Sequence, residues 1–264
     1  MMAKIDLNLQ FLFNEYEILD RYKKSHELGF KFVELQHPYS LDLNLLSSLI
    51  SDLDMAQVLI NIDVNNDETG KMNLAIDPKG IDKFKSSVDN SIRYCTELSV
   101  KVINCTPGPA IDDLERSVQY QTLIENLSYA APLFEECGTR LLIEPINTFD
   151  QPGFFISNSK DGAKVVADVS HRNFGLQYDV YHMQLMEGNI MNNIKKYIDI
   201  IGHFQIADVP GRLEPGKGEI GYSNIFKFID DLGYEGFIGA EYKPENTTEE
   251  GLAWIKKYDG LEIA

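Results

Sequence analysis

Cysteine is scarce in this sequence, and basic residues are outnumbered by acidic ones. The 264-residue chain contains three cysteines, Cys95, Cys105 and Cys137, and no C-x-x-C pair. An odd count without that spacing indicates neither a disulfide framework nor a zinc knuckle, so we expect reduced thiols and a cytoplasmic location. The 41 acidic and 24 basic residues give a formal net charge of −17. Such a surface repels nucleic acid and anionic lipid headgroups, so we expect neither as a partner.

Long apolar runs are also missing. No stretch of about 18 apolar residues occurs, so we expect no membrane span. The segment Met1–Phe13 contains Lys4 and Asp6 and no sustained apolar core, so we expect no signal peptide. A Gly/Ser-rich linker is absent, which predicts one domain over residues 1–264. A G-x-G-x-x-G motif after the first expected strand is absent too, and with it the usual marker of a dinucleotide-binding open sheet.

What the chain does contain is an alternation of short β-rich runs and amphipathic stretches. Eight such pairs in a chain of this length are typical of an α/β protein with the (β/α)8 TIM barrel fold. The expected strands are Ile5–Leu9, Phe32–Gln36, Ala56–Ile60, Val100–Asn104, Arg140–Glu144, Phe174–Asp179, Ile200–Ile206 and Phe237–Glu241. The expected helices are Tyr16–Leu28, Leu43–Leu53, Ile81–Leu98, Leu114–Cys137, Ser159–Val169, Glu187–Tyr197, Ser223–Leu232 and Thr248–Lys257. The polar segment Ile62–Ile76 interrupts this alternation, and we interpret it as a long βα loop.

Polar residues stand at the ends of four consecutive expected strands. Glu144 and Asp179 end the fifth and sixth strands. Gln205 lies near the end of the seventh, and Glu241 ends the eighth. Because active sites of TIM barrels lie at the carboxyl ends of the strands, these side chains should share one rim. Carboxylates gathered there repel one another without a cation, and oxygen ligands suit Mg²⁺ or Mn²⁺. The alternative is that each acid begins a solvated loop or caps a helix.

From Glu144 onward the chain carries several long ordered strings. They are E-P-I-N at 144–147, Q-P-G-F at 151–154, Q-Y-D-V-Y-H-M-Q at 177–184, G-H-F-Q-I-A-D at 202–208, P-G-R at 210–212, E-P-G-K-G-E-I at 214–220 and E-Y-K-P at 241–244. Together these strings resemble the hydroxypyruvate isomerase family of xylose-isomerase-like TIM barrels. The resemblance implies a metal-dependent isomerase of aldose–ketose type that converts hydroxypyruvate to tartronate semialdehyde through a metal-bound enediolate. Its partner would be a small anionic keto acid. The resemblance leaves open whether the chain forms a homo-oligomer.

The same resemblance implies roles for individual residues. It implies one divalent ion, Mg²⁺ or Mn²⁺, with four ligands: Glu144, Asp179, Gln205 and Glu241. Glu144 and Glu241 would also transfer the proton. His182 and Arg212 would contact the substrate, and the guanidinium fork of Arg212 suits the substrate carboxylate. His203 shares strand parity with Gln205 and either supports the ligands or packs in the barrel interior.

Two further features lie on the expected rim. The segment Val209–Gly221 contains two Pro-Gly pairs, which predicts a structured loop over the site. His37 follows the expected second strand, but we interpret it, like His26 and His171, as a structural or surface residue. The loop Ile62–Ile76 and the segment Cys105–Pro109 depart from the family pattern. Because βα loops shape the pocket, the exact substrate stays open.

Four other functions stay open at this point. An isomerase of a four-carbon oxo acid, of the 2-oxo-tetronate type, would share the metal and the carboxylate chemistry. A ketose 3-epimerase would act on a neutral sugar, but epimerases of this superfamily place His where this sequence has Gln205. An endonuclease of the same superfamily would need a basic face and a His-rich site, against a net charge of −17 and five histidines. A non-catalytic binding barrel is the fourth alternative.

Overall fold

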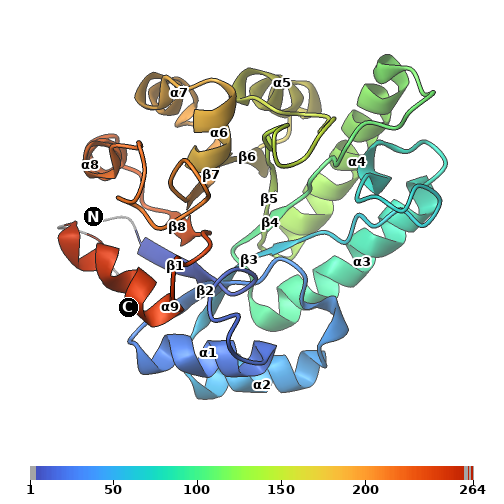
Figure 1. The fold of residues 1–264 in the computed structure, drawn as a ribbon. Helices are drawn as coiled ribbons and strands as arrows, with labels where there is room; N and C mark the ends of the chain where they lie inside the picture. Colours follow the sequence, from blue (N-terminus) through green and yellow to red (C-terminus); the bar gives the residue numbers. More distant parts are fainter. Residues whose placement is uncertain (1–3, 259–260, 262, 264) are drawn as a thin grey trace.

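The chain folds into a closed barrel of parallel strands surrounded by helices (Figure 1). The computed structural model describes residues 4–258, 261 and 263. The strands follow chain order around the barrel: β1 Lys4–Asn8, β2 Phe32–Glu34, β3 Ala56–Asn61, β4 Val102–Asn104, β5 Arg140–Ile143, β6 Phe174–Asp179, β7 Ile201–Ile206 and β8 Phe237–Ala240. The predicted TIM barrel is thereby confirmed. Residues 1–3, 259–260, 262 and 264 lie outside the described residues, and with them the first positions of Met1–Phe13 and both ends of the predicted domain.

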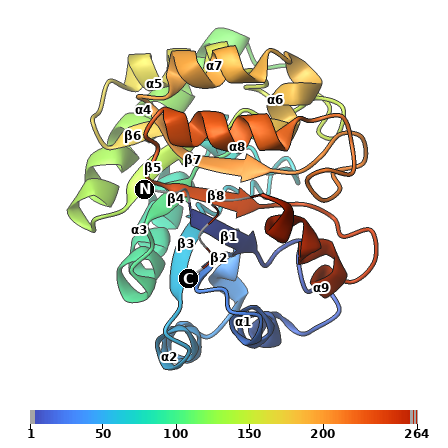
Figure 2. The same cartoon turned by 90° about the vertical axis from the view of Figure 1, so that its left-hand side faces the viewer.

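Helices follow the strands and form the outer layer (Figures 1 and 2). The α-helices are α1 Ile18–Glu27, α2 Leu43–Asp52, α3 Ile81–Leu98, α4 Arg116–Glu136, α5 Ser159–Val169, α6 Val180–Met186, α7 Ile190–Tyr197, α8 Tyr222–Asp231 and α9 Thr248–Gly251. Short 3-10 helices are η1 Pro38–Ser40, η2 Leu74–Ile76 and η3 Leu252–Lys257. Among the described residues, no helix combines the length and the apolar character needed to cross a lipid bilayer.

Pairing of β1 with β8 closes the barrel, so the two ends of the chain meet in one sheet. Figure 2 shows β1 beside β8. Lys4 lies opposite Phe237 and Leu7 opposite Ala240. The strands are buried on both faces because helices cover the outside and side chains fill the inside. All six residues of β6 are buried, for example. Polar side chains on such strands must therefore find partners inside the barrel or at its carboxyl end.

The structure differs from the sequence-based expectation in two helices. The expected helix Glu187–Tyr197 begins only at Ile190, and a helix that was not predicted, α6, starts directly after β6. Its seven residues are too few to show a clear helical period. The expected helix Thr248–Lys257 consists of the single turn α9 followed by η3. The segment Ile62–Ile76 is the long loop that was predicted, with η2 at its end.

Candidate active site

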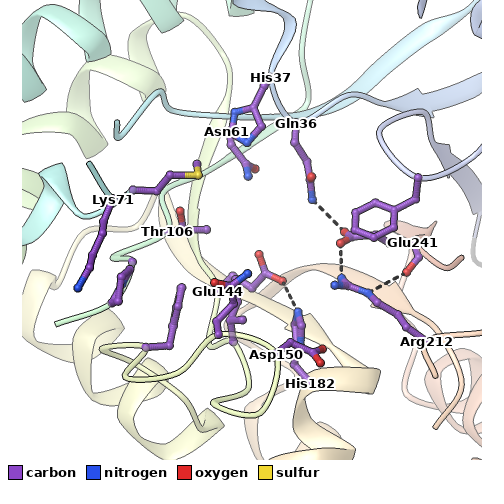
Figure 3. A pocket seen from close by; sticks show the side chains of 17 residues that line it. Gln36, His37, Asn61, Lys71, Thr106, Glu144, Asp150, His182, Arg212 and Glu241 are labelled. Atoms are coloured by element: carbon purple, nitrogen blue, oxygen red, sulfur yellow. Dashed lines mark hydrogen bonds and ion pairs between the residues drawn. The ribbon is translucent and has the colours of Figure 1, made fainter. Parts of the chain in front are cut away.

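The carboxyl ends of the strands surround a cavity of about 340 Å³ (Figure 3). Several of its polar lining residues lie within three residues of a strand end: Gln36 and His37 after β2, Thr106 after β4, Glu144 after β5 and Glu241 after β8. Of the predicted site residues, Glu144, His182, Arg212 and Glu241 line this cavity. His37 lines it too, at the rim position after β2 that the sequence analysis noted.

Three buried carboxylates gather at the floor of the cavity. Glu144, Asp179 and Glu241 are each at most 3% exposed. Burial, followed by repulsion from Glu241 and Asp179, raises the pKa of Glu144 well above its usual value. Burial raises the pKa of Glu241 to about 8, although the Arg212 guanidinium opposes the shift. Glu144 and Glu241 therefore hold protons far more tightly than carboxyl groups in water.

Asp179 both caps a helix and faces the other acids. Its Oδ1 accepts hydrogen bonds from the backbone N–H groups of Tyr181, at 2.8 Å, and His182, at 3.4 Å, at the start of α6. Its Oδ2 lies 3.4 Å from Nε2 of His182 and 3.5 Å from Nη2 of Arg212. The helix cap was the alternative to a metal ligand in the sequence analysis. In the structure the cap engages one oxygen and leaves the second directed at the site.

His182 is held by a residue that the sequence analysis did not single out, Asn147. Nδ2 of Asn147 lies 2.7 Å from Nδ1 of His182, and both side chains are buried. Oδ1 of Asn147 accepts hydrogen bonds from the backbone N–H groups of Phe149, at 3.0 Å, and Asp150, at 2.8 Å. Nε2 of His182 lies 3.9 Å from Oε1 of Glu144. Burial lowers the pKa of His182 to about 4, so the ring is neutral at pH 7.

Arg212 lies between the acids and two aromatic rings. Its Nη2 donates a hydrogen bond to Glu241 and lies close to Asp179. The guanidinium carbon is 4.6 Å from the ring centre of Phe11 and 5.2 Å from that of Tyr181. The backbone of Arg212 has φ 59°, a left-handed conformation that costs a side-chain-bearing residue about 1 kcal/mol or more. The guanidinium itself is held by its contacts with the two acids and the two rings.

The segment Val209–Gly221 that carries Arg212 is structured, as predicted, and one acid organises it. Asp208 is fully buried at the end of β7. Its carboxylate accepts four backbone hydrogen bonds of 2.8–3.0 Å, from the N–H groups of four loop residues: Val209, Gly216, Gly218 and Ile220. A Cβ at Gly218 would overlap the Val209 carbonyl oxygen, so glycine is required there.

Gln205 lies deeper than the cavity wall, in a polar network beneath the three acids. Its Nε2 donates to Glu34 at 2.8 Å, and its Oε1 accepts from Gln177 at 2.6 Å. Glu34 also accepts from Asn8 at 2.7 Å and lies 3.0 Å from Nε2 of His203. Asn8 in turn donates to Glu241 at 3.1 Å. Gln205 is the register partner of Asp179 on the neighbouring strand.

The donor set at the floor of the cavity suits a divalent cation. Side-chain atoms of Glu144, Asp179 and His182 lie within 4.8 Å of one another, so two carboxylates of the predicted ligand set converge here. Once deprotonated, these two acids and Glu241 would carry more negative charge than one guanidinium balances, and a hard divalent ion would offset the excess. Carboxylate oxygens are ligands that Mg²⁺ and Mn²⁺ prefer. The carbonyl oxygen of Gln205 retains a lone pair beyond its bond to Gln177.

The comparisons with known proteins agree with this geometry. The family described as xylose isomerase-like TIM barrel matches residues 22–258. Over 257 residues the chain is 40% identical to the hydroxypyruvate isomerase of Escherichia coli, which covers 97% of this chain and 100% of that protein. The chain belongs to the hydroxypyruvate isomerase family of xylose isomerase-like TIM barrels. It is an isomerase, as the sequence analysis predicted.

Two other similar proteins carry names other than hydroxypyruvate isomerase. The chain is 35% identical over 259 residues to the 2-oxo-tetronate isomerase of Cupriavidus necator, covering 98% of this chain and 100% of that protein. A crystal structure from Brucella melitensis described as an AP endonuclease of family 2 is 33% identical. It superimposes with a TM-score of 0.94 over 97% of this chain and 99% of that one. The fold is thus shared among relatives that carry different names.

Proposed function

We propose that this isomerase interconverts hydroxypyruvate and tartronate semialdehyde. The observation that carries the proposal is a pair of buried glutamates with raised pKa, Glu144 and Glu241, in the wall of one small cavity. An acid–base group is most effective when its pKa lies near the working pH. The names of the relatives in Escherichia coli and Cupriavidus necator support a small keto acid as the substrate class.

Glu144 and Glu241 are proposed to move the proton. One carboxylate removes a proton from the hydroxymethyl carbon, and the electron pair of that C–H bond becomes part of the enediolate double bond. The other carboxylic acid returns a proton to the former keto carbon, and the proton of the original hydroxyl group is transferred to the former keto oxygen as the aldehyde forms. The number of protons and electrons in the substrate is unchanged, so no redox cofactor is needed.

Glu144, Asp179, Gln205 and Glu241 are proposed to hold one Mg²⁺ or Mn²⁺ ion. When bound, such an ion supplies Lewis-acid stabilisation of the negative charge that develops on the substrate oxygens. His182 is proposed to donate a hydrogen bond to a substrate oxygen from Nε2. Arg212 is proposed to contact the substrate through its guanidinium group. Both are predictions carried over from the sequence analysis, together with a cytoplasmic location, no nucleic-acid partner and an open oligomeric state.

A substrate screen with metal-stripped and metal-reloaded protein tests the proposal. We expect turnover of hydroxypyruvate with Mn²⁺ or Mg²⁺ and its loss after chelation. A four-carbon 2-oxo-tetronate is the second candidate, because the 2-oxo-tetronate isomerase relative matches the full chain. Higher kcat/KM for neutral ketoses than for either acid would replace the proposal with a 3-epimerase. Incision of DNA at an abasic site would replace it with an endonuclease, against the net charge of −17.

A further inference from the structure

Among the described residues, the cavity wall contains one lysine or arginine besides Arg212, which is Lys71. Three acids line the cavity, Glu144, Asp150 and Glu241, and the positive charge of Arg212 already faces Glu241 and Asp179. An anionic substrate that enters a chain of net charge −17 needs a positive group that is not already balanced. Figure 3 places Lys71 on the side of the cavity away from Arg212, with Glu144 between them.

The ammonium group of Lys71 is only loosely engaged. Its ion pair with Asp112 spans 3.8 Å, and the two side chains are 47% and 92% exposed. Ion pairs of this kind contribute little, because water and salt screen them. A lysine side chain is a flexible four-carbon stem with a point charge, so it can turn from Asp112 toward the cavity at small cost.

The backbone that carries Lys71 is fixed, although it belongs to the long polar loop. The N–H of Asn66 donates to the carbonyl of Lys71 at 2.9 Å in a short antiparallel bridge. The buried amide of Asn66 donates to Asp77 at 2.7 Å, and that of Asn73 donates to the Pro109 carbonyl at 3.1 Å. The Asn and Asp residues that interrupt the sequence pattern here form the hydrogen bonds that hold the segment together. Hydrogen bonds thus hold the backbone around Lys71, whereas its ammonium group makes only the weak ion pair with Asp112.

We infer that Lys71 binds the carboxylate of the substrate and makes the enzyme prefer keto acids to neutral sugars. The inference rests on the proposed function, and it gives Arg212 the role of a contact to the reacting oxygens. In hydroxypyruvate the carboxylate is attached to the keto carbon, whereas dihydroxyacetone carries a neutral hydroxymethyl group at the same position. Lys71 therefore contacts the part of the substrate that differs between the two. A contact made equally in the ground state and the transition state acts mainly on KM.

Kinetics of Lys71→Met on both substrates tests the inference, with Lys83→Met as the matched control. Lys83 pairs with Asp67 of the same loop at 2.6 Å and is not part of the cavity wall, so its loss changes the net charge equally. We expect Lys71→Met to raise KM for hydroxypyruvate about 10-fold or more, the usual scale for a charge-assisted hydrogen bond. Dihydroxyacetone and Lys83→Met should show less than a 2-fold change. Lys71→Arg should recover most of the loss, because it keeps the charge.

The outcomes separate the two claims. An equal change for acid and neutral substrate, or equal losses in Lys71→Met and Lys71→Arg, would overturn the role of Lys71. So would an equal effect of Lys83→Met. If the unmodified enzyme isomerises no keto acid, the proposed function fails, and calorimetric binding of tartronate then decides the role of Lys71. We expect about 10-fold weaker tartronate binding by Lys71→Met alone. Unchanged binding would overturn the inference.

Discussion

Nδ2 of Asn147 lies 2.7 Å from Nδ1 of His182, and this contact fixes which ring nitrogen carries the proton. Oδ1 of Asn147 is engaged by the backbone N–H groups of Phe149 and Asp150, so the amide nitrogen must face the ring. An amide nitrogen only donates, hence Nδ1 accepts and the proton of the neutral ring is on Nε2. That nitrogen is directed at Asp179 and Glu144. His182 therefore enters the reaction as a donor.

Without the Nδ2 donor of Asn147, the proton of the neutral His182 ring should no longer be confined to Nε2. We expect Asn147→Leu, which has a similar size, to lower kcat about 10-fold, the lower end of the effect of losing a group that orients a metal-site histidine. Nitrogen-15 NMR of the imidazole should show the Nδ1–H tautomer appearing beside the Nε2–H form. Thermal unfolding provides the control for general damage. An unchanged tautomer ratio together with unchanged kcat would contradict the assignment.

The two proton-transferring glutamates should respond to amide substitution. Glu241→Gln and Glu144→Gln each keep an oxygen ligand but remove a base, so kcat should fall about 10²-fold or more. Metal binding should persist, measured by calorimetric titration with Mn²⁺. Glu27→Gln is the control, since Glu27 is exposed on α1 and pairs only with Lys24 among the described side chains. Near-normal turnover of Glu241→Gln with metal bound would show that another group moves the proton.

The raised pKa values make the metal-free protein less stable as the pH rises. Glu241, with a pKa of about 8 in the folded chain and about 4.3 unfolded, binds its proton more tightly when folded. Its contribution to the unfolding free energy is therefore fully present below about pH 4.3 and is lost as the pH rises through about 8. Glu144 shifts in the same direction. We expect the Tm of chelator-treated protein to fall between pH 5 and 8.5.

Added Mn²⁺ should reverse that trend. A metal ion binds the deprotonated carboxylates, so its affinity and its stabilisation of the fold increase with pH. The rise in Tm on adding Mn²⁺ should be larger at pH 8 than at pH 5. Differential scanning calorimetry at both values checks this. An equal rise at the two pH values would argue against ligands that include Glu144 and Glu241.

The fixed position of the Lys71 loop depends on Gly108. A Cβ at Gly108 would overlap the backbone carbonyl of Met72, and φ is 73°. Gly138 has φ 77° but no atom within 4 Å of a Cβ position. Gly138→Ala should therefore cost about 1 kcal/mol, the strain of alanine in the left-handed region. Gly108→Ala should lower the free energy of unfolding several-fold more, as measured by chemical denaturation. Equal losses for the two variants would show that the loop shifts easily to accommodate the added Cβ.

The sequence was sufficient to predict the barrel and the acids at the strand ends. The strands are buried and contain few polar residues, so polar residues at their ends, such as Glu144 and Asp179, are easy to recognise. The order of strands in a TIM barrel then places those residues on one rim. Relatives and the closed barrel confirm the family and the fold. The roles of the four ligands and of His182 and Arg212 stay predictions.

The sequence analysis missed residues whose roles depend on contacts that form only in the folded chain. Asn147 differs from any other loop asparagine only through its contact with a ring 35 residues away. Lys71 was hidden because the loop Ile62–Ile76 has no period from which to place a side chain. Asp208 lies in a recognised string, but its function follows from four N–H groups that converge when the loop folds. Local patterns do not encode such long-range contacts.

The hydrogen bond from Asn8 to Glu241 joins residues 233 positions apart, across the seam where β1 meets β8. A contact of that sequence separation closes a long loop, and the entropic cost of loop closure has to be met before the contact stabilises the fold. The environment of Glu241 is complete only when β8 has paired with β1. We therefore expect recovery of turnover during refolding to lag behind recovery of helical circular dichroism. Closure of the barrel and completion of the catalytic pair are thus one structural event.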